Sequence, residues 1–77
     1  MEQDIYKLLG LKIKELRKKS KLTQAELAEK AGVTQAELSK FEKRGEEIRS
    51  VSRINALLSC LGYEIDVAEK KTLLISA

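Results

Sequence analysis

The stretch that decides the fold is residues 22–38, LTQAELAEKAGVTQAEL. It contains the pentapeptide TQAEL twice, with the two copies starting at Thr23 and Thr34. In each copy the threonine can cap a helix, and a glutamate three residues later can reach back to the cap, which is the pattern of a capping box. The spacing of the copies is far too short for a solenoid repeat. The pattern therefore predicts two short helices that start with the same chemistry.

The segment between the two copies predicts a tight turn. The first helix is expected to end at Ala31, because Gly32 can adopt the left-handed conformation that a sharp exit requires. Ala28 is small enough to let the second helix cross the first one closely. Two capped helices joined by one glycine turn are typical of a helix-turn-helix. The side chains of this pair that are predicted to face the core are Leu27, Leu38 and Phe41.

Further helices are predicted on both sides of this pair. Apolar residues between Ile5 and Leu16 recur at steps of four, four and three, which predicts a helix over about residues 3–20. The second helix of the pair is expected to run to about residue 43. Ser50 is expected to cap a fourth helix, which Gly62 ends.

A strand is predicted after the fourth helix. Tyr63, Ile65 and Val67 alternate with polar or small residues, which is the period of a strand. Residues 69–71 are predicted to turn, and residues 72–75 to form a second strand or a tail. A lone strand leaves backbone donors and acceptors unpaired, so it needs a partner. That partner is either residues 72–76, in a hairpin, or the same strand of a second chain; the second chain is favoured, with the hairpin as an addition.

The composition limits what the chain can be. Its 77 residues make one small domain, and 43% hydrophobic with 35% charged residues is a globular composition. With no His and one Cys, the sequence excludes a disulfide framework and a zinc site of the Cys/His type. It shows no catalytic triad and no Gly-rich phosphate loop, so no enzyme, metal or cofactor is predicted. With neither a membrane span nor a signal peptide, we expect a cytoplasmic protein.

Positive charge is concentrated in one segment. Six basic residues and one acid lie between Lys12 and Lys21, whereas the whole chain has a net charge of +3. Such a run is either a solvated helix face or a footprint for phosphates. With aromatic residues at 4% of the chain, there is no platform on which single-stranded bases could stack. If nucleic acid is bound, duplex DNA is therefore favoured.

The sequence resembles a known family. The segments LTQAELA at residues 22–28, AGV at residues 31–33, and FE at residues 41–42 look like the helix-turn-helix domain of phage repressors and Cro proteins. The likeness covers about residues 9–62. The strand that follows resembles the tail of HipB-like antitoxins, which repress their own operons, bind a toxin and pair this strand across a twofold axis. The resemblance thus implies a mainly α, four-helix helix-turn-helix domain over residues 1–62. A C-terminal β-strand and tail over residues 63–77 would pair across a dimer.

Candidate site residues follow from the outer surface of the second TQAEL helix and from the resemblance. The first residue of the earlier helix contacts a phosphate in the family, and an arginine of the first helix pairs with a glutamate that closes the third. Glu37 is expected to serve the capping box, although a carboxylate can also accept from a cytosine amino group. The expected base contacts are Gln35, Ala36, Ser39 and Lys40; the expected phosphate contacts are Gln24, Thr34, Lys43 and Arg44; the expected structural pair is Arg17 with Glu42; and the expected dimer strand contains Tyr63, Ile65 and Val67.

The function predicted from these features is sequence-specific repression of transcription. The partners would be double-stranded DNA with a palindromic operator and a second copy of the chain. The narrower prediction is the antitoxin of a toxin–antitoxin operon, with a toxin protein as a further partner. Two alternatives stay open: a stand-alone regulator without a toxin, and an interaction adaptor that uses the same fold without DNA. Solvated charge on a loop likewise stays open for Lys43 and Arg44.

Overall fold

The computed structural model describes residues 5–68 and 72–76, which form four helices and a pair of antiparallel strands, called the hairpin below. The four-helix, mainly α prediction is confirmed. The predicted helix start at residue 3 and the predicted turn at residues 69–71 lie outside the described residues. The elements in chain order are α1 (Ile5–Lys19), α2 (Gln24–Ala31), α3 (Gln35–Arg44), α4 (Val51–Cys60), β1 (Glu64–Ala68) and β2 (Thr72–Ser76).

Both capping boxes that the sequence predicts are present. The Thr23 hydroxyl accepts from the backbone N–H of Glu26 at 3.1 Å, and the Thr23 N–H donates to the Glu26 carboxylate at 2.9 Å. Thr34 and Glu37 repeat this exchange at 3.0 and 2.9 Å. Gly32 then closes α2 in the left-handed conformation, with φ 75°. Local chemistry therefore fixes where α2 and α3 begin and how the turn between them is made.

The core lies between the four helices. Its largest fully buried apolar side chains come from each of them and from the loop before α4, where Ile48 is 0% exposed. Leu27, Leu38 and Phe41, which the sequence placed in the core, are all 0% exposed, and Ala28 is 3% exposed. Ile5 and Val51 are exceptions, because both lie in the first turn of a helix and stay exposed. Leu8 and Leu11, which lie farther along α1, are exposed as well, so the buried face of this helix is narrower than the apolar residues predict.

Close packing of α1 on α3 explains Gly10, which the sequence presents only as a weak point in a helix. A Cβ atom built on Gly10 would overlap the carbonyl oxygen of Phe41 and lie 3.5 Å from the Cα of Glu42. The two backbones therefore approach each other at a point where no side chain fits. This contact sets the distance between α1 and α3.

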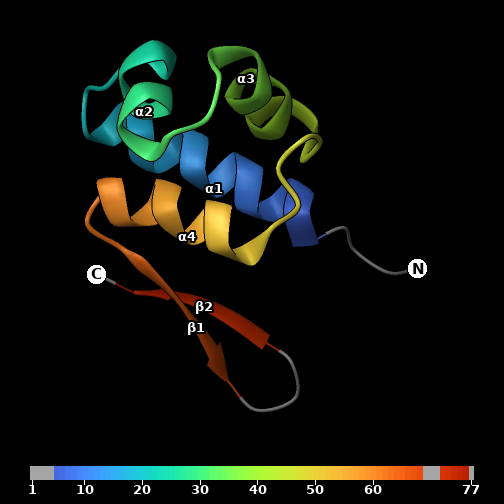
Figure 1. Cartoon of the computed structure of the whole chain (residues 1–77). Helices are drawn as coiled ribbons and strands as arrows, with labels where there is room; N and C mark the ends of the chain where they lie inside the picture. Colours follow the sequence, from blue (N-terminus) through green and yellow to red (C-terminus); the bar gives the residue numbers. More distant parts are fainter. Residues whose placement is uncertain (1–4, 69–71, 77) are drawn as a thin grey trace.

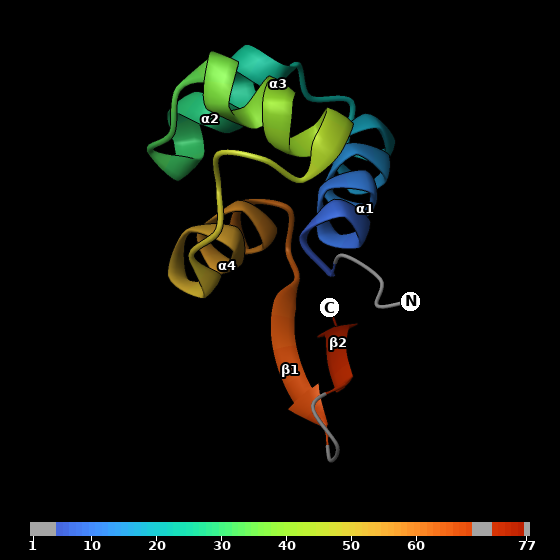
Figure 2. The ribbon, with the colours of Figure 1, turned by 90° about the vertical axis from the view of Figure 1, so that its right-hand side faces the viewer.

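The hairpin lies at the end of the molecule opposite α2 and α3 (Figure 1). The quarter-turn view in Figure 2 shows the same separation. Strands β1 and β2 pair antiparallel, from Glu64 opposite Ser76 to Ala68 opposite Thr72. One edge of β1 is thus occupied within the chain. Pairing of this strand with a second copy stays a prediction.

Candidate nucleic-acid interface

The outer surface of α3 carries the side chains expected to contact bases. Gln35, Ala36 and Lys40 are exposed and Ser39 is half-buried. Their spacing places them on one side of the helix, with Leu38 and Phe41 buried on the other. The side chains near the start of α3 are therefore the ones available to a partner that approaches this helix.

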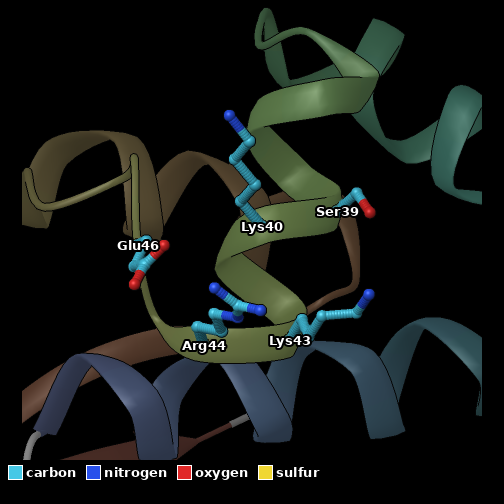
Figure 3. A pocket seen from close by; sticks show the side chains of 5 residues that line it. All are labelled: Ser39, Lys40, Lys43, Arg44 and Glu46. Carbon is cyan, nitrogen blue, oxygen red and sulfur yellow. The ribbon is translucent and has the colours of Figure 1, made fainter.

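A hollow of about 380 Å³ lies at the second half of the same surface. Figure 3 shows Lys40, Lys43 and Arg44 projecting from α3, with Glu46 on the loop that follows. Ser39 completes the lining. Three cations and one carboxylate make this hollow suited to an anion such as a backbone phosphate. Lys43 and Arg44, the expected phosphate contacts, are both exposed here.

The two expected phosphate contacts at helix starts, Thr34 and Gln24, differ in how exposed they are. Thr34 is exposed, and its hydroxyl accepts from the backbone N–H of Glu37 at 3.0 Å. Gln24 is half-buried, and its amide Nε2 donates to Oε1 of Glu42 at 3.1 Å. The link from Gln24 to Glu42 was not foreseen. It commits part of this side chain to holding the fold.

The arginine and glutamate that the resemblance implied as a pair lie together in a buried ion pair. Nε of Arg17 donates to Oε2 of Glu42 at 2.7 Å, and NH2 donates to Oε1 at 3.0 Å. Arg17 is 8% exposed and Glu42 2%, and a third guanidinium donor reaches the carbonyl of Leu22 at 2.9 Å. Together with Gln24, the pair joins α1, α2 and the end of α3. These hydrogen bonds to Glu42 fix the end of α3 on its buried side, opposite the exposed surface.

A second ion pair holds the start of α3, and the sequence did not reveal it. Oε1 of Glu37 accepts from NH2 of Arg53 in α4 at 3.0 Å and from the backbone N–H of Thr34 at 2.9 Å. The Thr34 N–H, followed by the Arg53 guanidinium, lowers the pKa of Glu37 from its ordinary value. The carboxylate is therefore ionised at neutral pH and occupied by partners within the chain. This favours the capping role of Glu37 over contact with cytosine.

The remaining expected site residues lie at the hairpin. Tyr63 is half-buried and packs against the core, immediately before β1. In the strand register Ile65 stands opposite Ile75 and Val67 opposite Leu73. Strand β1 lies at the end of the molecule opposite α3 (Figure 1). A role in assembly and a role in reading DNA would thus use opposite ends of the molecule.

The described residues were also compared with the requirements of a metal site and of a membrane-spanning helix. Among residues 5–68 and 72–76 no group of three or more His, Cys, Asp or Glu side chains is arranged to hold a metal ion. None of the helices described is both long and apolar enough to span a membrane.

Comparisons with known proteins place this geometry among regulators. Residues 13–67 match a family described as helix-turn-helix. The clp gene regulator ClgR from Corynebacterium glutamicum is 29% identical, with a TM-score of 0.73 over 80% of this chain and 65% of that one. SinR, the master regulator for biofilm formation, solved in complex with DNA, is 33% identical, with a TM-score of 0.64 over 70% of this chain and 86% of that one.

A complex of SinR with SinI gives the same identity and TM-score, over 70% of this chain and 52% of that one. The match thus spans less than two thirds of ClgR and about half of the matched chain in this complex. Curated proteins gave no match.

Proposed function

Because the chain belongs to the helix-turn-helix family, we propose that it is a transcription regulator that binds duplex DNA with α3 in the major groove. The observation that carries the proposal is the outer surface of α3. Exposed groups that can pair with base edges lie near its start, and Lys43 and Arg44 lie at its end. A recognition helix uses its N-terminal residues in this way, while cations beyond them meet the backbone.

Each expected contact has a defined part in this proposal. Gln35 and Lys40 offer hydrogen bonds to bases, and Ser39 offers a hydroxyl. The small side chain of Ala36 allows apolar contact with a thymine methyl group. The helix is positioned on phosphates by Thr34, Lys43 and Arg44. Gln24 contributes with the amide hydrogen that it does not donate to Glu42. SinR, 33% identical, has been solved with DNA, which supports the same partner for this chain.

The assembly that we propose is a twofold dimer on a palindromic operator. Two recognition helices about 34–36 Å apart fit successive major grooves on one side of a duplex. In the sheet of the described residues β2 occupies one edge of β1, and we propose that a second copy pairs with the other edge. The hairpin lies away from α3, so such a contact leaves both reading surfaces open (Figure 2).

The choice among narrower functions depends on a partner outside this chain. The antitoxin role rests on the likeness of the C-terminal strand, and a toxin gene adjacent in the operon would support it. ClgR and SinR are named as regulators, which supports a role in regulation for both of these alternatives. An adaptor that does not use DNA would show no salt-dependent binding to duplexes.

Removing a cation at the end of α3 is expected to weaken binding to every duplex alike. We expect Lys43→Ala and Arg44→Ala each to reduce the slope of log affinity against log salt by about 1, because each removes one phosphate contact. The measurement is fluorescence anisotropy with two unrelated duplexes, between about 50 and 200 mM salt.

The matched control for these variants is Lys12→Ala. Lys12 is an exposed lysine of α1 that pairs with Glu15 at 3.3 Å. It lies two residues from Gly10, about 200° round the helix from the side that packs on α3. An equal loss in Lys12→Ala would assign the effect to net charge or to the basic run of α1. No loss in Lys43→Ala or Arg44→Ala would remove α3 from the backbone contact.

A further inference from the structure

Glu47 has an unusual backbone conformation in the loop between α3 and α4. Its φ is 77°, in the left-handed region that residues with a long side chain rarely adopt. Among the residues that the structure describes, the other non-glycine residue with a positive φ is Lys21, which is placed by the hydrogen bonds that end α1. Strained backbone of this kind is a reason to look for a functional role in the side chain.

The side chain of Glu47 reaches the recognition surface. Its Oε1 lies 3.8 Å from Nζ of Lys40, and the two side chains are 46% and 61% exposed. A pair this open and this long stabilises a fold very little. Glu46, its neighbour, lines the hollow with Lys40, Lys43 and Arg44 (Figure 3). Two consecutive acids therefore stand at the edge of the surface that would meet a polyanion.

We propose that Glu47 is a specificity-determining residue, which lowers affinity for unrelated DNA by competing with phosphate for Lys40. This inference rests on the proposed function and concerns the same surface. Binding to unrelated sequences depends almost entirely on cations that neutralise phosphates, so a carboxylate beside Lys40 weakens it. At the correct site Lys40 donates to a base acceptor, such as O6 or N7 of guanine, and the released Glu47 carboxylate accepts from a cytosine amino group, so the loss is recovered only where the sequence offers both groups. Discrimination thus gains from a repulsive element against the wrong partner.

The test compares two duplexes in the wild type and in Glu47→Gln. One is a duplex of random sequence, and the other is the duplex that the wild-type chain selects from a randomised pool. We expect Glu47→Gln to bind the random duplex about two- to five-fold more tightly, in line with an exposed ion pair, and with a steeper salt dependence. Affinity for the selected duplex should change less, so the ratio of the two affinities falls.

Two controls make the result specific to Lys40. Glu15→Gln removes the same charge from an exposed Lys–Glu pair on α1, at 3.3 Å, and should leave both affinities unchanged. In a Lys40→Ala background, Glu47→Gln should lose its effect on the random duplex, because the proposed action passes through Lys40.

Each other outcome has a distinct meaning. Equal gains on both duplexes, a gain of the same size in Glu15→Gln, or persistence of the effect without Lys40 would overturn the role of Glu47 while leaving DNA binding intact. A wild type that binds no duplex at all would overturn the proposed function, and this inference with it. A wild type that binds duplexes with an unchanged ratio in Glu47→Gln would overturn only the inference.

Discussion

Glu42→Ala is expected to destabilise the fold by about 3–5 kcal/mol, because it leaves the Arg17 guanidinium buried without its carboxylate. Arg17 is 8% exposed, and both of its donors to Glu42 are 3.0 Å or closer. Gln24 would lose its acceptor in the same step. For a chain of this size such a loss of stability lowers Tm by more than about 10 °C. Urea unfolding followed by circular dichroism measures it.

Two variants show whether burial of the charge is the cause. Glu29→Ala, at an exposed position of α2, should change stability by no more than about 0.5 kcal/mol. Replacing both partners, as Arg17→Met with Glu42→Leu, should recover much of the loss, since an apolar pair of similar size leaves no unpaired charge. A loss below about 1 kcal/mol in Glu42→Ala would mean that the pair behaves as a solvated one.

Gly10→Ala is expected to destabilise the fold by about 2–3 kcal/mol or more, although alanine is the better helix former by about 1 kcal/mol. The added Cβ would overlap the Phe41 carbonyl oxygen, which belongs to the backbone of α3 and cannot rotate away. The helices would have to separate, with loss of core contacts. Thermal and urea unfolding of the variant give the sign and size of the change.

Gly62→Ala serves as the comparison for this substitution. Gly62 has φ 86°, but nothing lies within 4 Å of a Cβ built there. Only backbone strain of about 1–2 kcal/mol is therefore expected. If Gly10→Ala were instead more stable than the wild type, intrinsic helix propensity would outweigh the contact between α1 and α3, and their close approach would be contradicted.

The parts of the fold that the sequence could predict are those set by local chemistry. A threonine and a glutamate three residues apart define a helix start wherever they occur, so the starts of α2 and α3 were found correctly. The buried face of each helix follows from spacing in the same way. These signals are contained within a few residues and need no knowledge of what packs on the helix.

The features that the sequence missed depend on how the helices cross. Arg53 meets Glu37 from a position sixteen residues away, and Gln24 meets Glu42 from eighteen residues away. Neither pair has a local signal, because both need α4 or α2 to be already placed against α3. The demand for glycine at residue 10 likewise arises only once α3 lies on α1. The pair of Arg17 and Glu42 was expected through family resemblance alone.

Selection from a pool of randomised duplexes, by the wild type and by Gln35→Ala, tests most directly whether α3 reads DNA. The wild type is expected to enrich two inverted half-sites spaced by about 10 bp, one helical turn. Gln35→Ala should keep the spacing but lose preference at particular base pairs, a difference of about 1–3 kcal/mol at those positions. Enrichment of one isolated half-site would contradict the dimer only. No enriched sequence, or the same preferences in Gln35→Ala, would contradict α3 as the reading helix.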